Sequence, residues 1–440
     1  MSVKPPLSDN MPEVVFSDIE TVKLGNVNIY FIEDNTQDLF NCMIVNLAGS
    51  SHDTLPGLSY LTHILLSYGS SKSNYEEISL RQDMLGAYMS SQCNADEGGI
   101  KIISLAEHYE KSMDIMLECY FSPAFTETEL ERVQKKVTSS IRQSKADPGF
   151  LASYAMMKAY YGEHPYSHAS FGDEESITKI TSNDVLDFYN NVVLRSEHAV
   201  FVSGKFDKES VIEKLKSHIS KFPEAQAVNL PVFGGLQKQI SAVIDKKNAQ
   251  QSNLIIASEG IAPNSTDLPA VKIANVIFGG YFMSRLNEIL REQHGFTYGI
   301  GSHFRHRRLS NEFMISSSLN TENLRKAIDI INDIKNDFSS NPVSDEEFTR
   351  AVRYYTGNFT VNLESHMQIA NLVKGIFIHK LDKDHYKKLL ENIMKLSIND
   401  VFEAQQKYFN PANSVIAVSG EPETINKELT GLGELITINA

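Results

Sequence analysis

The sequence predicts an α+β (α/β layered) protein of two homologous domains, each a mostly antiparallel sheet packed with long helices. Three observations support this prediction. Short apolar runs alternate with long helical patterns, the two halves of the chain match each other, and a segment containing prolines and a glycine pair separates them. Of the 440 residues, 42% are apolar and 22% are charged, which is ordinary for globular proteins. A packed core in each half is therefore expected.

The two halves of the chain carry the same pattern. Residues 177–204 align without a gap on residues 393–420, an offset of 216, and both segments end in Val-Ser-Gly. Shorter matches at offsets of 215 and 218 keep the same order along the chain. A repeat of this length indicates duplication of a whole domain rather than a solenoid.

A segment containing Pro223, Pro231 and the pair Gly234-Gly235 lies between the halves. Prolines and glycines at this density are typical of a linker. We therefore predict an N-terminal domain over 1–222, a linker over 223–238 and a C-terminal domain over 239–440.

Each predicted domain has the same order of elements. Short apolar runs predict buried strands, and longer patterns of apolar residues at helical spacing predict helices. Asn-Asp pairs that precede apolar helical runs suit helix N-termini. The predicted strands are 42–47, 199–202, 253–257 and 415–418, the helices are 107–120 and 322–338, and the N-termini are at 183–184 and 399–400.

Composition excludes several classes of function. The net charge of -14 argues against nucleic acid as a partner, because nucleic-acid binding needs clustered lysine and arginine. No stretch reaches the roughly 18 apolar residues of a membrane helix, so no membrane insertion is expected. Three distant cysteines without a CxxC motif are interpreted as buried thiols. The first residues show no secretory pattern, which predicts a cytoplasmic protein, or a periplasmic or organellar one if a precursor segment was removed.

One motif in the second half is highly specific. Phe278-Gly279-Gly280, Ser284-Arg285-Leu286 and the pattern LRExxGxxY over 290–298 follow each other closely. This succession resembles the insulinase/pitrilysin family of zinc peptidases (inverzincins), in particular its processing-peptidase-like branch. The resemblance covers essentially the whole chain. It implies two-domain subunits that enclose a clam-like peptide chamber on dimerisation.

The zinc-binding positions of that family are changed in this sequence. Peptide-cleaving members carry the inverted zinc motif HxxEH on the first helix after a Gly-Leu pair, and a further glutamate about 75 residues downstream completes the ligands. The matching positions here are Tyr60, His63, Ile64 and Ser140. Isoleucine and serine are not useful zinc ligands, so the resemblance implies a chain that lacks zinc and has no peptidase activity of its own. We interpret His63 as a satisfied or partly exposed histidine on a helix.

The substrate-binding residues of the family are retained in the second half. The resemblance implies that Arg291 and Tyr298 hold the substrate backbone and help to stabilise the oxyanion. The plainer interpretation is a surface arginine with a tyrosine packed beside it. In the strand expected to pair with substrate, Ser90-Ser91 and Cys93 depart from the family pattern, although main-chain pairing would survive that change.

These observations predict a non-catalytic subunit of a heterodimeric zinc peptidase, whose HxxEH-containing sister subunit would hold the zinc and cleave the peptide. One alternative is a peptide-binding or structural homologue that acts without proteolysis, with a homodimer as the alternative assembly. Another is a metalloendopeptidase with a metal site rebuilt around His63. The basic stretch 303–308 is interpreted as a solvated loop or strand face, with contact to an acidic peptide or partner as the alternative.

Overall fold

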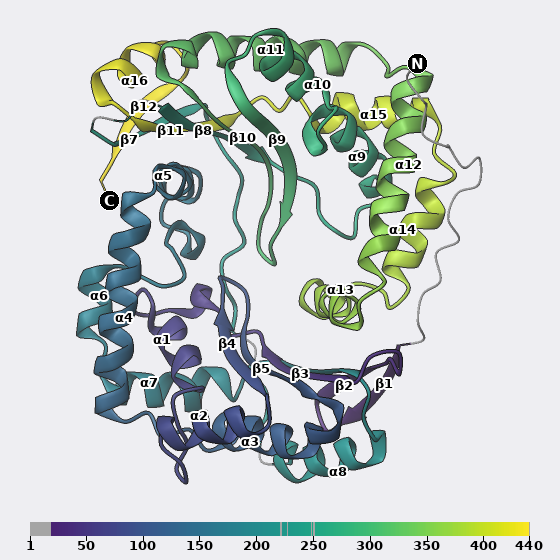
Figure 1. Ribbon diagram of the computed structural model, residues 1–440. Helices are drawn as coiled ribbons and strands as arrows, with labels where there is room; N and C mark the ends of the chain where they lie inside the picture. The colour runs from purple at the N-terminus through teal and green to yellow at the C-terminus, as the bar shows by residue number, and fades with distance from the viewer. Residues whose placement is uncertain (1–18, 221, 227, 248, 250, 440) are drawn as a thin grey trace.

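The computed structural model describes residues 19–220, 222–226, 228–247, 249 and 251–439. In these ranges the strands form two six-stranded sheets, one in each half of the chain, and helices surround both sheets (Figure 1). Most neighbouring strands are antiparallel, which confirms the predicted α+β class.

The first sheet has the strand order β1-β2-β6-β3-β5-β4. Among its described pairs, β2 and β6 are parallel and the others are antiparallel. The central strands β3 and β6 are buried along almost their whole length, as their apolar runs predict. The strands are β1 (Glu20–Leu24), β2 (Val27–Glu33), β3 (Leu39–Asn46), β4 (Tyr88–Cys93), β5 (Gly98–Leu105) and β6 (His198–Gly204).

The second sheet repeats this arrangement with the order β12-β7-β11-β8-β10-β9. The repeat differs at one edge. There β1, from the start of the chain, is antiparallel to β2, whereas β12, from the end of the chain, is parallel to β7. The strands are β7 (Ile240–Asp245), β8 (Gln251–Glu259), β9 (Thr297–His306), β10 (Asn311–Asn320), β11 (Ser414–Gly420) and β12 (Glu434–Ile438).

The helices of the two halves also correspond in order. The first half contains α1 (Leu58–Leu65), α2 (Tyr75–Met84), α3 (Tyr109–Phe121), α4 (Glu127–Ala146), α5 (Pro148–Tyr161), α6 (Glu174–Lys179), α7 (Ser182–Phe188) and α8 (Lys208–Ile219). The second contains α9 (Leu268–Asn275), α10 (Arg285–Asn287), α11 (Leu324–Ser340), α12 (Asp345–Asn362), α13 (His366–His379), α14 (His385–Ile393), α15 (Ile398–Tyr408) and α16 (Pro422–Glu428).

The two predicted helix N-termini are built alike. Thr181 caps α7 and Ser397 caps α15, each accepting a hydrogen bond from the backbone N–H three residues later. The residues at that position, Asp184 and Asp400, return the bond to the backbone N–H of the cap. This reciprocal arrangement is a capping box. The Asn-Asp pairs therefore lie in the first turn of each helix, and the caps are the residues two positions before each pair, Thr181 and Ser397.

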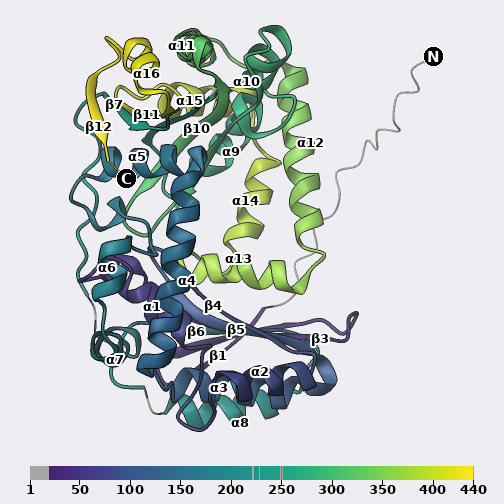
Figure 2. The same ribbon diagram turned by 60° about the vertical axis from the view of Figure 1, so that its left-hand side comes forward.

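Each half of the chain supplies one helix to the sheet of the other half. Helix α5 packs on β7, β8 and β11 of the second sheet, and α13 packs on β2 and β6 of the first. On the first sheet, Phe377 of α13 lies 6.2 Å from Phe201 of β6 between ring centroids. Figure 2 shows α13 crossing the first sheet and α5 lying beside the second. The exchanged helices therefore connect the two halves, because each helix packs on the sheet of the other half.

The segment between α8 and β7 contains no helix or strand among its described residues. It is nevertheless packed. The Phe233 ring lies 5.0 Å from the rings of both Tyr160 and Tyr161 on α5, measured between centroids. The backbone N–H of Phe233 also donates to Leu309 O. This segment is thus held against the contact between the halves.

Within the described ranges, no helix is both long enough and apolar enough to cross a membrane.

Candidate functional site

Helix α1 carries three of the four positions that correspond to the zinc motif. It begins after Gly57, whose φ of 92° is favourable only for glycine. Asp53 caps this start by accepting hydrogen bonds from Gly57 N at 2.9 Å and Ser59 N at 2.7 Å. Burial raises the pKa of Asp53 to about 7, despite these two donors. The helix is thereby anchored to the core of the first half through Leu58, Leu61 and Leu65.

His63 is completely buried and both ring nitrogens face protein atoms. Nδ1 lies 2.7 Å from Ser59 O and Nε2 lies 3.1 Å from Asn46 Oδ1, and a neutral ring donates its single N–H to one of these two oxygens. Burial lowers the pKa of the imidazole to about 4, which leaves the ring neutral at pH 7. The ring also covers Gly98, where an added Cβ would lie 2.2 Å from Nε2. His63 therefore fills a space in the core and has no free nitrogen for a metal.

The polar contacts of His63 continue through the first half. Asn46 Nδ2 donates to the hydroxyl of Tyr120 at 3.2 Å, and that hydroxyl donates to His198 Nε2 at 2.7 Å. His198 Nδ1–H in turn donates to Ser196 O at 2.8 Å. This buried chain joins α1, β3, α3 and β6. Networks of this kind specify a unique core when their members are satisfied.

The other three positions supply no metal ligand of the usual kind. Tyr60 and Ile64 are half-buried on α1, and the Tyr60 ring stands edge-on to Phe171 with centroids 6.3 Å apart. Ser140 is exposed on α4, and its hydroxyl donates to Lys136 O at 3.1 Å. The ammonium of Lys136 is close enough to Tyr60 to lower its phenol pKa, although burial raises that pKa overall.

The residues at this place do not fit a zinc ion. Zinc sites need at least three protein ligands from cysteine, histidine and carboxylates. Here one enclosed imidazole is accompanied by a phenol, an aliphatic side chain and a hydroxyl. Among the described residues, no group of three or more His, Cys, Asp and Glu side chains is arranged so that it could hold a metal ion. No catalytic step through a metal follows from this geometry.

Part of the retained motif in the second half has a structural role. Phe278, Leu286 and Leu290 are fully buried in the core of this half. Gly279 is required because an added Cβ would lie 2.4 Å from Ser302 Oγ. The guanidinium of Arg285 pairs with Glu347 at 2.8 Å and lowers the pKa of that carboxyl to about 2, against the effect of its burial. These residues explain why the segment folds as it does without any reference to substrate.

Arg291 and Tyr298 are brought together at the surface. The π-helical turn Glu288–Gln293 ends before Gly295, whose φ of 64° reverses the chain into β9. As a result, the Arg291 guanidinium lies 5.5 Å from the centroid of the Tyr298 ring and 4.3 Å from that of Phe282. Tyr298 is 93% exposed and Phe282 is 66% exposed. Such cation–π contacts orient an arginine while keeping its N–H groups available.

Phe282 was not singled out by the sequence, and Met283 beside it is also exposed. Both lie between the Gly279-Gly280 pair and Ser284. Two large apolar side chains within this motif were the sequence feature that could have identified them as part of the surface. We call Phe282, Met283, Arg291 and Tyr298 the Arg/Tyr surface. Within this chain the Arg/Tyr surface and α1 belong to different halves, with α1 at the bottom of Figure 1 and α10 at the top.

The interpretation of residues 303–308 as a solvated face is wrong for its central arginines. Arg305 contacts the carboxylate of Glu312 at 2.7 Å and Arg307 contacts it at 3.5 Å, and Glu312 is fully buried. The hydroxyl of Tyr161 on α5 donates to the same carboxylate. Because a buried carboxylate needs partners, the two arginines are drawn into the contact between the halves. Arg308 is exposed.

Comparison with protein families defines the class of this protein. Residues 29–174 match the model described as insulinase (peptidase family M16), and residues 179–355 match the model described as peptidase M16 inactive domain. The chain therefore belongs to the insulinase (M16) family, as its motif predicts.

Two relatives bear names that deny peptidase activity, and a third is named a zinc protease. The chain is 24% identical over 299 residues to a Helicobacter pylori protein named "Non-peptidase homolog YmxG", a match that covers 68% of this chain and 69% of the relative. It is 22% identical over 232 residues to "Probable inactive metalloprotease YmfF" of Bacillus subtilis, covering 50% and 53%. Another B. subtilis relative, 20% identical over 321 residues, covering 72% and 77%, is named "Uncharacterized zinc protease YmxG".

Solved structures share the fold over nearly the whole chain. A peptidase M16 inactive domain from Pseudomonas fluorescens superposes with a TM-score of 0.83 at 24% identity, covering 92% of this chain and 98% of that one. A protease from Helicobacter pylori gives a TM-score of 0.81 at 17% identity, covering 92% and 100%. Together with the four replaced zinc positions, the names of the two inactive relatives support an inactive member of the family.

Proposed function

We propose that this chain is the non-catalytic subunit of a heterodimeric M16 peptidase. Its first half would be a scaffold with a filled zinc position, and its second half would present Arg291 and Tyr298 to a peptide bound at the zinc of a sister subunit. The observation that carries this proposal is the difference between the zinc position on α1 and the Arg/Tyr surface. The zinc position is filled by the core, whereas the Arg/Tyr surface is intact and open.

The geometry of the Arg/Tyr surface supports a substrate-facing role. The Arg291 side chain is 24% exposed and makes one long ion pair, 3.4 Å to the exposed Glu292. Its guanidinium is oriented by the two aromatic rings, so its orientation does not depend on substrate. A preorganised arginine with a neighbouring phenol can hold a peptide carbonyl or a developing oxyanion. An almost fully exposed tyrosine is also hard to explain by packing within one chain.

The sheet edges support binding of an extended peptide. Strand β4 pairs only with β5, and β9, which begins at Thr297 beside Tyr298, pairs only with β10 among the described strands. A free edge offers main-chain N–H and C=O groups to an added strand. Ser90, Ser91 and Cys93 lie on β4, where this pairing would depend little on their side chains.

The experiment is isolation of the chain from its source under native conditions. The mass of the intact complex is measured and every co-purifying chain is sequenced. We expect a sister chain with an HxxEH motif and one zinc per heterodimer. In the reconstituted complex, Arg291→Ala or Tyr298→Phe is expected to slow peptide cleavage about tenfold to hundredfold without preventing assembly. Arg325→Ala, which removes an arginine of α11 paired with Asp329, is the matched control.

Turnover unchanged by both substitutions would contradict the role given to the Arg/Tyr surface. A complex that contains this chain alone would instead favour the second candidate function, a peptide-binding or structural homologue that acts without cleavage, as a homodimer or otherwise. The two free sheet edges favour that candidate equally. A rebuilt metal site around His63 has no support, because the ring is completely buried and both of its nitrogens face protein oxygens.

A further inference from the structure

Four histidines and one lysine meet where α13 ends against the second half of the chain. His303 and His306 lie on β9, His379 is the last residue of α13, His385 is the first residue of α14, and Lys272 comes from α9. We call these five residues the histidine cluster. The rings of His306 and His379 stand edge-on, with centroids 6.4 Å apart. The Lys272 ammonium is close enough to lower the pKa of every histidine of the cluster except His379.

The histidine cluster lies across a joint between the two halves. Helix α13 is fixed to the first sheet, where Lys374 pairs with the buried Glu97 at 2.7 Å. Helix α14 packs instead on α9 of the second half. Figure 2 shows α13 on the first sheet and α14 between α13 and the second half. His379, which belongs to α13, therefore meets His306 of the second sheet across this joint.

His306 has one ring nitrogen without a partner. Nδ1 lies 3.0 Å from Ile261 O and 3.4 Å from Asn311 Oδ1. Because a carbonyl only accepts, the hydrogen of the neutral ring is on Nδ1 and Nε2 is a bare acceptor. Nε2 is buried, and none of the described residues forms a hydrogen bond with it. A proton added to Nε2 would create a buried, unpaired N–H with a positive charge beside Lys272 and His379.

The surroundings oppose this proton. Burial, with the help of Lys272 and His379, lowers the pKa of His306 to about 4. Burial also lowers the pKa of Lys272, and no carboxylate opposes that effect.

Two carboxylates that face the cluster already have cationic partners. Glu312 faces His303, but it is held by Arg305 and Arg307. Asp382 faces His385 and pairs with Lys388 at 3.1 Å. Neither carboxylate is therefore free to stabilise a protonated imidazole.

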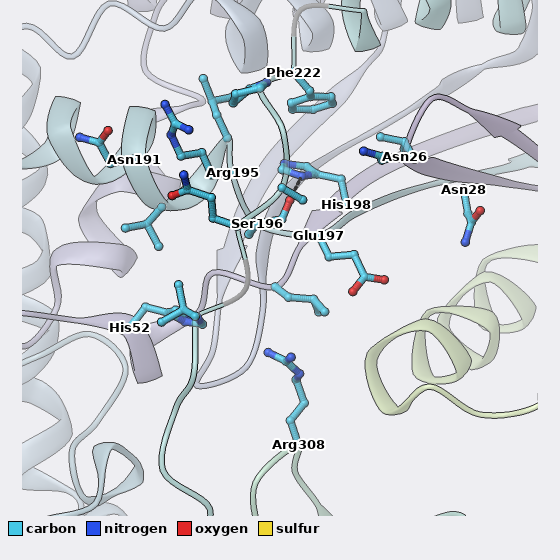
Figure 3. Close-up of a pocket in the computed structure, with 18 of the residues that line it drawn as sticks. Asn26, Asn28, His52, Asn191, Arg195, Ser196, Glu197, His198, Phe222 and Arg308 are labelled. Carbon is cyan, nitrogen blue, oxygen red and sulfur yellow. Dashed lines mark hydrogen bonds between the residues drawn. The ribbon is translucent and has the colours of Figure 1, made fainter.

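Asp96 is the carboxylate that faces His379, and it does so together with Arg308. Burial lowers the pKa of His379, Asp96 raises it, and Arg308 lowers it, with a lowered pKa as the result. Asp96 and Arg308 also face His52 of the first half. Arg308 extends from the turn between β9 and β10 into a pocket lined by first-half residues that include His52 (Figure 3). One carboxylate thus faces two histidines and an arginine.

We propose that the histidine cluster is an acid-sensitive joint, at which protonation of His306 and His379 releases the end of α13 from β9 and loosens the closed arrangement of the two halves. Each sheet keeps the helix that the other half supplies, so the halves move as folded units. In the open arrangement the imidazoles are solvated and take up a proton near their ordinary pKa of about 6.5. Because the closed arrangement lowers that pKa, it loses stability as pH falls through about 6.5, and the loss levels off near the lowered value of about 4.

The test is amide hydrogen exchange of the full-length chain at pH 7 and at pH 5, read by mass spectrometry of peptides and corrected for the intrinsic pH dependence of exchange. Residues 376–386, the end of α13 and its connection to α14, are expected to lose protection about tenfold or more at pH 5. The buried strands β3 and β6 are expected to keep their protection. His306→Asn, which retains an amide donor near the position of Nδ1, and His379→Gln are each expected to reduce the loss.

His294→Asn is the matched control, because His294 is an exposed histidine of the second half outside the cluster. It is expected to leave the acid response unchanged. Lys272→Met removes the charge beside the histidines without removing an imidazole. It is expected to raise their pKa and so to weaken the acid response.

Unchanged protection of residues 376–386 at pH 5 overturns the inference. Loss of protection in β3 and β6 at the same pH also overturns it, because the response is then global unfolding. A third contrary result is a full acid response in His306→Asn, His379→Gln and Lys272→Met, with circular dichroism showing that the variants are folded.

Discussion

The imidazole of His63 is enclosed by α1, β3 and β5, and its two nitrogens face Ser59 O and Asn46 Oδ1. In a peptidase of this family the matching position must be a carboxylate that reaches a metal-bound water. Here the side chain points into the core and its neighbour Ile64 offers no ligand atom. The replacement of the zinc motif is thus visible in the direction and contacts of individual side chains, within an undisturbed helix.

The buried histidines predict a loss of stability in acid. Burial lowers the pKa of His63 and of His198 to about 4, below the ordinary value of about 6.5. As pH falls through 6.5, the unfolded chain binds protons that the folded chain cannot accept, so the free energy of unfolding decreases until about pH 4. Each histidine contributes up to about 3 kcal/mol to this decrease. Denaturant unfolding between pH 7 and pH 4 measures it.

Asp53 acts in the opposite sense, because burial raises its pKa. The readout is therefore the difference between variant and wild type. His63→Asn is expected to show a shallower decrease toward acid than the wild type, and substitution of the half-buried surface residue His108→Asn is expected to leave the slope unchanged. Equal slopes in wild type and His63→Asn would refute the assignment of a neutral, buried ring.

The contact between His63 and Gly98 gives a second prediction. Gly98→Ala is expected to cost about 1–3 kcal/mol, since the new Cβ would lie 2.2 Å from Nε2. Combining it with His63→Ala removes the clash, so the double variant is expected to lose less stability than the sum of the single ones. Gly357→Ala on α12, where an added Cβ meets nothing within 4 Å, is the control and is expected to be neutral or stabilising. Strict additivity would contradict the packing described.

At the scale of elements, the exchanged helices α5 and α13 determine how the halves depend on each other. Besides its apolar face, α13 contributes His366, whose Nδ1 lies 3.0 Å from Ser203 Oγ, and Lys374, which pairs with the buried Glu97 at 2.7 Å. In the opposite direction, Ser419 Oγ of β11 donates to Pro148 O of α5 at 2.6 Å. Both helices therefore use polar as well as apolar contacts to set their position.

Truncation of one side chain tests the contribution of α13. Phe377 is buried on the first sheet, so Phe377→Ala is expected to cost about 3–5 kcal/mol through lost burial and the cavity left behind. Val361→Ala, an exposed position on α12, is expected to change stability by less than about 0.5 kcal/mol. Urea unfolding measures both. A small effect of Phe377→Ala would show that α13 is dispensable to the first sheet.

At the scale of the whole molecule, the two halves are expected to unfold together. Residues 1–222 lack α13, the cover of their own sheet, and carry α5, whose apolar face belongs on the other sheet. We expect one calorimetric transition for the full chain and no folded state for the fragment 1–222. Two separate transitions, together with a fragment that folds alone, would contradict this prediction.

Much of the architecture could be predicted from the sequence. Apolar runs such as 253–257 indicated buried strands, the nearly constant offset between the halves indicated duplication, and four unsuitable side chains indicated that the zinc motif of the family is replaced. Other features could not be predicted. An apolar helix such as α5 has the same sequence pattern whichever sheet it covers. The burial of Arg305 and Arg307 depends on their contact with the buried Glu312, which only the folded structure shows.

The central claim is that this chain cannot hold the zinc of its family. Its most direct test is the metal content of the purified full-length chain, measured by plasma mass spectrometry after incubation with zinc and removal of the excess. The structure predicts far less than one zinc per chain, and no peptide cleavage that a chelator abolishes. One tightly bound zinc per chain, lost to a chelator together with peptide cleavage, would contradict the account.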